Sequence, residues 1–121
     1  MDRRYSHDIE VQLLGRPGVL LFGEKVSFPY QKVEGLFYYL CVNNQISRSQ
    51  AISVLWAGNS EATARKNLRD AVYNIRKVLG QDILTVEGNT LIVLNRQMDI
   101  DIDMEHITRE NLLESWKGEF L

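Results

Sequence analysis

The segment from Ser60 to Gly80 concentrates positive charge on a predicted helix. It carries five Lys or Arg residues against two acids, although the 121-residue chain has a formal net charge of −2. Apolar residues recur in it at spacings of four, three and four, which is typical of a helix with one buried stripe. They are Leu68, Val72, Ile75 and Leu79. At about 100° per residue, the basic side chains fall together on one flank of this stripe. The pattern indicates a polyanionic partner, and it also fits an ordinary solvated helix face.

Three features of the segment favour the polyanionic partner over the solvated face. The basic residues bunch on one side, and we expect them to lack a Glu partner one helical turn away. Tyr73 lies among them. Asn67 and Asn74 lie just beyond, and an Asn side chain can pair with the edge of an adenine base.

Composition limits the classes of protein that the chain can belong to. With 45% hydrophobic and 25% charged residues, 121 residues predict one domain with a substantial core. No apolar run is long enough to span a membrane, and residues 1–8 lack the apolar segment of a signal peptide. The single cysteine, Cys41, excludes an internal disulfide, so we expect core packing for this residue and a cytoplasmic location for the protein.

The rest of the sequence predicts strands first, helices next and a hairpin last. Alternating apolar residues over 9–13 predict a strand, and runs over 19–22 and 25–28 complete a small antiparallel meander. After Pro29 the apolar period changes to that of a helix reaching about Asn43. Ile46 fits one short strand.

A second helix follows Ser47, which stands three residues before Gln50 as in a capping box. Ser60 or Asn59 caps the long helix. Runs over 83–86 and 91–94 flank a turn of sequence E-G-N-T and predict a hairpin. Residues 99–103 alternate Asp with Ile as in a strand, and residues 104–116 read as a short helix.

This order of elements is typical of a winged helix. The second and third helices are joined by a short turn containing Gly, which matches a helix-turn-helix, and a hairpin directly after the third helix matches the wing. We therefore predict an α+β fold: a winged helix-turn-helix with an N-terminal antiparallel sheet, a three-helix core and a C-terminal β-hairpin. In such a fold the third helix enters the major groove of DNA.

The same residues resemble the winged-helix domain of the Streptomyces antibiotic regulatory protein family and, more distantly, the effector domain of OmpR-like response regulators. The family pattern has Ser-Arg before the second helix, Leu-Trp at its end, and Ala-Arg-x-x-Leu-Arg followed by Leu-Arg-Lys-x-Leu-Gly along the third helix. The matching residues here are Ser47-Arg48, Leu55-Trp56, Ala64-Arg65, Leu68-Arg69, Arg76-Lys77 and Leu79-Gly80. The resemblance spans roughly residues 9–105. The family often has a basic residue near the hairpin tip, and E-G-N-T contains none.

The resemblance implies sequence-specific recognition of double-stranded DNA by a transcriptional activator that recruits RNA polymerase. We expect base contacts from the middle of the third helix, made by Lys66, Arg69, Tyr73 and Asn74. We expect phosphate contacts from Arg48, Arg65, Arg76, Lys77 and the indole N–H of Trp56. Members of these families occupy direct repeats as pairs, so a dimer on DNA is expected, and the loop 57–60 is a candidate surface for the polymerase.

The chain is expected to divide into a DNA-binding domain over 1–104 and a segment over 105–121. The second segment reads either as the start of a following helical activation domain or as a C-terminal helix. Its residues 116–121 resemble a short sequence motif found early in that activation domain of the antibiotic regulators. Residues 97–121 hold seven acids and two bases.

Other kinds of site find little support in the sequence. Asp99, Asp101 and Asp103 match part of a calcium loop, but Met104 stands where that loop requires Gly. No Gly-rich phosphate loop, metal-ligand set or nucleophile with a base is present, so we expect neither a cofactor nor an enzyme. The alternative to a DNA-binding regulator is a winged helix that binds an acidic protein or a second copy of itself, without DNA. The acidic total charge and the hairpin tip without a cation support this alternative.

Overall fold

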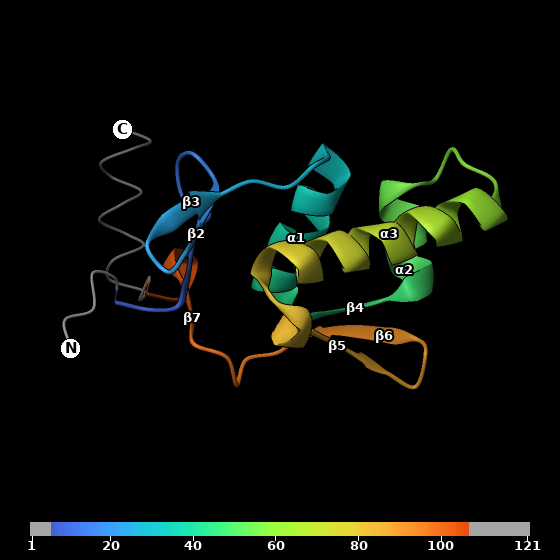
Figure 1. Ribbon diagram of the computed structural model, residues 1–121. Coiled ribbons are helices and arrows are strands. Elements are labelled where there is room, and N and C mark those ends of the chain that lie inside the picture. The colour runs from blue at the N-terminus through green and yellow to red at the C-terminus, as the bar shows by residue number, and fades with distance from the viewer. Residues whose placement is uncertain (1–5, 107–121) are drawn as a thin grey trace. The chain divides into compact units, whose positions relative to one another are not determined.

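The computed structural model describes residues 6–106. They form two compact units, one from residues 6–25 and 100–106 and the other from residues 26–99 (Figure 1). The first unit contains a four-stranded sheet, and the second contains three α-helices and a three-stranded sheet. The described chain is therefore α+β. None of its described helices has the length and apolar character needed to cross a membrane.

The sheet of the first unit has the strand order β3-β2-β1-β7. Strands β1 (Ile9–Gln12) and β2 (Gly18–Leu21) are antiparallel, and β3 (Glu24–Val26) follows a tight turn at the edge. Strand β7 (Ile100–Ile102) instead runs parallel to β1. The predicted meander is confirmed, but the expectation of a purely antiparallel sheet is wrong, because the far end of the described chain adds a parallel strand.

Asp103 fixes the end of β1. Its two carboxylate oxygens accept hydrogen bonds from the N–H groups of Leu13, at 2.9 Å, and Leu14, at 3.1 Å. A 3₁₀ helix over Asp103–His106 follows directly. The helix predicted over 104–116 lies, beyond residue 106, outside the described residues.

The three predicted α-helices are confirmed in the second unit as α1 (Gln31–Asn43), α2 (Arg48–Leu55) and α3 (Glu61–Leu79). Ser47 caps α2, since its Oγ accepts a hydrogen bond from the Gln50 N–H at 3.0 Å. The reciprocal bond of a capping box is not formed, because the Gln50 side chain donates to the Tyr39 hydroxyl instead. Ser60 caps α3 through the N–H of Thr63.

The core of the second unit is formed where α1 and α3 pack together and where α1 packs onto β4 and β6 of the sheet. Helix α1 contributes Phe37, whose ring lies 5.6 Å from that of Phe28, centroid to centroid. The whole predicted stripe of α3 is buried. The fully buried large side chains of this unit are Leu36, Phe37, Leu40, Ile46, Leu68, Ile75, Ile83, Leu84, Ile92 and Leu94. Cys41 is buried as expected.

The three-stranded sheet, of order β4-β6-β5, holds the predicted hairpin. Strands β5 (Leu84–Glu87) and β6 (Leu91–Leu94) are antiparallel, and β4 (Gln45–Ser47) pairs with the other edge of β6. Between β5 and β6, Gly88 and Asn89 have φ of 57° and 59°. This left-handed conformation suits Gly and Asn, which explains the E-G-N-T turn.

Candidate nucleic-acid interface

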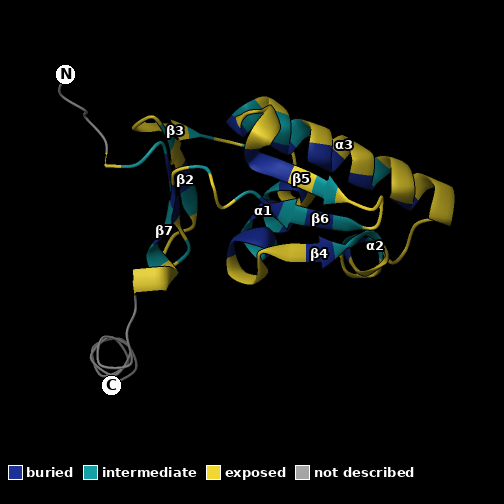
Figure 2. Ribbon diagram, turned by 90° about the horizontal axis from the view of Figure 1, so that it is seen from below, coloured by how far each residue is buried: buried dark blue, intermediate teal, exposed yellow. Residues whose placement is uncertain are grey.

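The outer side of α3 carries a cationic face formed by the exposed residues Lys66, Arg69 and Lys77, with the exposed acid Asp70 beside them. Leu68 and Ile75 point inward and are buried, whereas Lys66, Arg69 and Tyr73 are exposed on the opposite side. Figure 2 shows this division along the helix, with buried residues toward the sheet and exposed residues outward. The helix has 19 residues, which at about 1.5 Å per residue gives a length of about 28 Å. The cationic face therefore extends along the helix, and its side chains do not pack in the core.

An open groove of about 930 Å³ lies beside this face, between α2, the first half of α3 and the tip of the β5–β6 hairpin. Three of the predicted contact residues line it together: Arg48 from α2, and Arg65 and Arg69 from α3. The remaining walls are mostly hydroxyl, amide and small side chains. Those that bear on the argument are Ser49, Ser53, Asn89 and Thr90. The groove thus combines three guanidinium groups and one carboxylate, that of Glu61, with neutral hydrogen-bonding groups.

The positive charge of the groove is only partly neutralised. Arg65 forms an ion pair with Glu61 one turn earlier, so the expectation that the cations lack such a partner is wrong for this residue. Within residues 6–106, neither Arg48 nor Arg69 forms an ion pair with a carboxylate. The Nε of Arg48 is also buried and has no hydrogen-bond partner among these residues. The one acid that lines the groove, Glu61, is paired with Arg65, so the guanidinium groups of Arg48 and Arg69 remain to favour an anion there.

Arg76 lies on the same flank of α3 but is held in a different way. It is half-buried, and its Nη2 donates a hydrogen bond of 2.9 Å to the main-chain oxygen of Leu84, the first residue of β5. The side chain therefore ties the base of the hairpin to the last turns of α3. The predicted phosphate contact from Arg76 remains a prediction, in addition to this structural bond.

Replacing Arg76 by methionine should lower the free energy of unfolding by about 1.5–3 kcal/mol, because a hydrogen bond to a charged donor is lost and the Leu84 oxygen is left unsatisfied. Urea unfolding followed by circular dichroism measures this change. The control is Lys77→Met, which removes the same charge from the adjacent exposed position and should change stability by no more than about 0.5 kcal/mol. Equal effects of the two substitutions would contradict the bond's stabilising role.

The remaining predicted site residues do not line the groove. Trp56 is buried, with 5% of its surface exposed, and it lines a separate hollow of about 470 Å³ together with Asn74. That hollow lies on the other flank of α3 and also contains Asp70. Asn74 donates from its side chain to the main-chain oxygen of Asp70 at 2.9 Å. Lys66, Tyr73 and Lys77 occupy the exposed face between the two flanks, where Tyr73 is 59% exposed.

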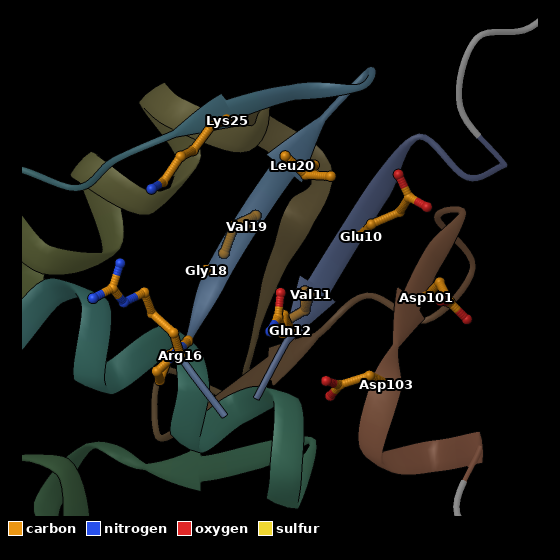
Figure 3. A pocket seen from close by; sticks show the side chains of 11 residues that line it. Glu10, Val11, Gln12, Arg16, Gly18, Val19, Leu20, Lys25, Asp101 and Asp103 are labelled. Carbon is orange, nitrogen blue, oxygen red and sulfur yellow. The ribbon is translucent and has the colours of Figure 1, made fainter. Parts of the chain in front are cut away.

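The first unit carries a third hollow, of about 550 Å³, on one face of its sheet. Figure 3 shows Arg16 and Lys25 on one side of this hollow and the acids Glu10, Asp101 and Asp103 on the other. The last two acids already have partners: Asp103 accepts two main-chain N–H groups, and Asp101 contacts His106. The charges that line this hollow are therefore mixed, with three acids and two cations, whereas the groove beside α3 has one acid and three cations.

Sequence reasoning missed the part of the groove that comes from the hairpin tip. Asn89 and Thr90 were expected only as turn residues, but the structure places them in the same groove as Arg48 and Arg69. Ser49 and Ser53 of α2 were also missed. Residue spacing in the sequence does not indicate that the hairpin tip lies in the groove, because the position of the tip depends on how β4 and β6 pair.

Two further observations concern metals and relatives. Among residues 6–106, no group of three or more His, Cys, Asp or Glu side chains is arranged to hold a metal ion. No protein-family model matches the chain, and no match to it is found among curated proteins.

Proposed function

We propose that this protein is a sequence-specific DNA-binding transcription regulator. In this proposal the second unit is a winged helix, α2 and α3 form its helix-turn-helix, and the β5–β6 hairpin is its wing. Support comes from the order of elements: a short α2, the turn 56–60, the long α3 and then the hairpin. The major groove of B-DNA is about 12 Å wide and admits one α-helix, which we assign to α3.

One observation carries the proposal: the exposed cationic face of α3 adjoins a groove in which Arg48 and Arg69 lack carboxylate partners among the described residues. The chain as a whole has a net charge of −2, so this positive charge is local. Unneutralised guanidinium groups beside an exposed helix complement the phosphates that border a major groove. We assign base contacts to Lys66, Arg69 and Tyr73.

The wider role is proposed on the family resemblance. It comprises activation from direct-repeat sites bound by pairs of molecules, recruitment of RNA polymerase, and a bacterial cytoplasm as the location. Trp56 and Asn74 line the hollow on the other flank of α3. We therefore give them a secondary part in the interface, where the second phosphate backbone bordering the major groove would pass.

Binding of the purified protein to a labelled pool of random-sequence duplexes, followed by selection of the tightest binders, tests the proposal. If about five phosphates are contacted, the logarithm of the affinity should fall against the logarithm of the salt concentration with a slope of about −4 to −5. The selected duplex should bind at least about tenfold more tightly than the random pool, since base contacts add discrimination.

Absence of binding to any duplex at about 50 mM salt would overturn the proposal. The matched competitor is polyglutamate, which offers negative charge without phosphate or bases. If polyglutamate displaced the duplex at equal charge concentration and no sequence were selected, the protein would instead be a module that binds acidic proteins. The hairpin tip without a cation is the observation that favours that second reading.

A further inference from the structure

The β5–β6 hairpin extends only a short distance beyond its supporting strand. The last residue pair of the hairpin is Glu87 with Leu91, and Leu91 also lies opposite Ser47, the N-cap of α2. Only residues 88–90 therefore extend past β4. The tip thus projects past β4 by no more than about two residues of extended chain, or roughly 7 Å.

The tip is also fixed in place beside α2. The N–H of Arg48, the first residue of α2, donates a hydrogen bond of 2.8 Å to the main-chain oxygen of Thr90. This bond continues the β4–β6 pairing by one step. The tip therefore stays next to the start of α2, and it cannot swing outward without breaking a main-chain hydrogen bond.

The chemistry of the tip does not suit a minor groove. The minor groove has a negative potential that attracts inserted Arg or Lys side chains. The turn Gly88-Asn89-Thr90 has no cation, and the preceding Glu87 is an exposed acid. Asn89 and Thr90 do line the groove that contains Arg48 and Arg69. An amide and a hydroxyl can each donate a hydrogen bond to a phosphate oxygen.

We propose that the hairpin tip, together with Arg48, holds one phosphodiester strand of duplex DNA in this groove and does not enter the minor groove. This inference rests on the proposed function. Asn89 and Thr90 donate to the strand beside Arg48, whose main chain is bonded to Thr90, while Arg69 of α3 contacts the adjoining base edge. The hairpin then contributes affinity and register on the DNA but reads no base.

The test uses the selected duplex and the double variant Asn89→Gly/Thr90→Val. Glycine keeps the positive φ of residue 89, and valine keeps the shape of threonine without its hydroxyl. Affinity should fall about 5- to 10-fold through loss of two neutral donors, with an unchanged salt slope because no cation is removed. The matched control is Asn44→Gly/Thr85→Val, since Asn44 has a similar φ of 70° and Thr85 is an exposed threonine of β5. The control should stay within about twofold of the unaltered protein.

Modified duplexes identify which part of the DNA the tip contacts. Replacing single phosphates by neutral methylphosphonates should reveal one position whose effect largely disappears in the Asn89→Gly/Thr90→Val variant. Replacing flanking guanines by inosine removes only the minor-groove amine, and it should change affinity by less than about twofold.

The results separate this inference from the proposed function. If the unaltered protein binds DNA, but inosine in the flanks weakens binding or the tip variant behaves like its control, the tip does not hold a strand and DNA binding still stands. If the unaltered protein binds no duplex, both proposals fail together.

Discussion

Replacing Arg48 and Arg69 together by alanine should weaken binding to the selected duplex by about 100-fold. Loss of a base contact from Arg69 costs about 1–3 kcal/mol, and loss of a phosphate contact from Arg48 reduces the salt slope by about 1. Both side chains line the groove and have no carboxylate partner among the described residues. Their replacement therefore breaks no ion pair within the described part of the protein. Fluorescence anisotropy at several salt concentrations measures affinity and slope together.

The matched control for this experiment is Arg16→Ala/Lys25→Ala, which removes the same charge from the hollow of the first unit. Its affinity for the duplex should stay within about threefold of the unaltered protein, because only long-range attraction is changed. Thermal unfolding of both variants checks that they fold. A similar loss in both would show that total charge, and not the groove, determines binding.

Replacing Phe37 by alanine should produce the largest loss of stability, about 3–5 kcal/mol, because a fully buried aromatic ring is lost and leaves a cavity. A domain of this size is stable by about 5–15 kcal/mol in total, so the variant should be close to unfolding at physiological temperature. Urea unfolding measured by circular dichroism gives the free energy directly.

The aromatic control is Tyr30→Ala, whose side chain is 70% exposed just before α1. It should change stability by no more than about 0.5 kcal/mol. A loss for Phe37→Ala as small as this would mean that the core relaxes around the missing ring. In that case the packing of α1 against α3 would contribute less to the free energy of unfolding than the burial of Phe37 indicates.

The sequence predicted the elements of the second unit well because their signals are local. The stripe of α3 depends only on helical periodicity, and the Gly88-Asn89 turn depends only on which residues tolerate positive φ. The parallel pairing of β7 with β1 was not predictable in this way, because its partners come from opposite ends of the described chain. The pairing of β4 with β6 is nonlocal in the same sense.

The candidate site was only partly predictable for the same reason. The cations of α3 were visible in the sequence, but Asn89 and Thr90 join them only through the β4–β6 register. The bond from Arg76 to Leu84 depends on how the hairpin packs against α3. The pairing of Glu61 with Arg65 is different: the two residues are four apart on one helix, so the sequence alone was sufficient to predict it.

The separation of the two faces of α3 has a practical consequence for engineering. Ala62, Lys66, Arg69 and Tyr73 are all exposed on one side, and none of them belongs to the core. A library randomised at these four positions would vary the chemistry offered to a ligand while leaving the scaffold intact. Variants that prefer a different ligand could then be compared with one another on the same buried core.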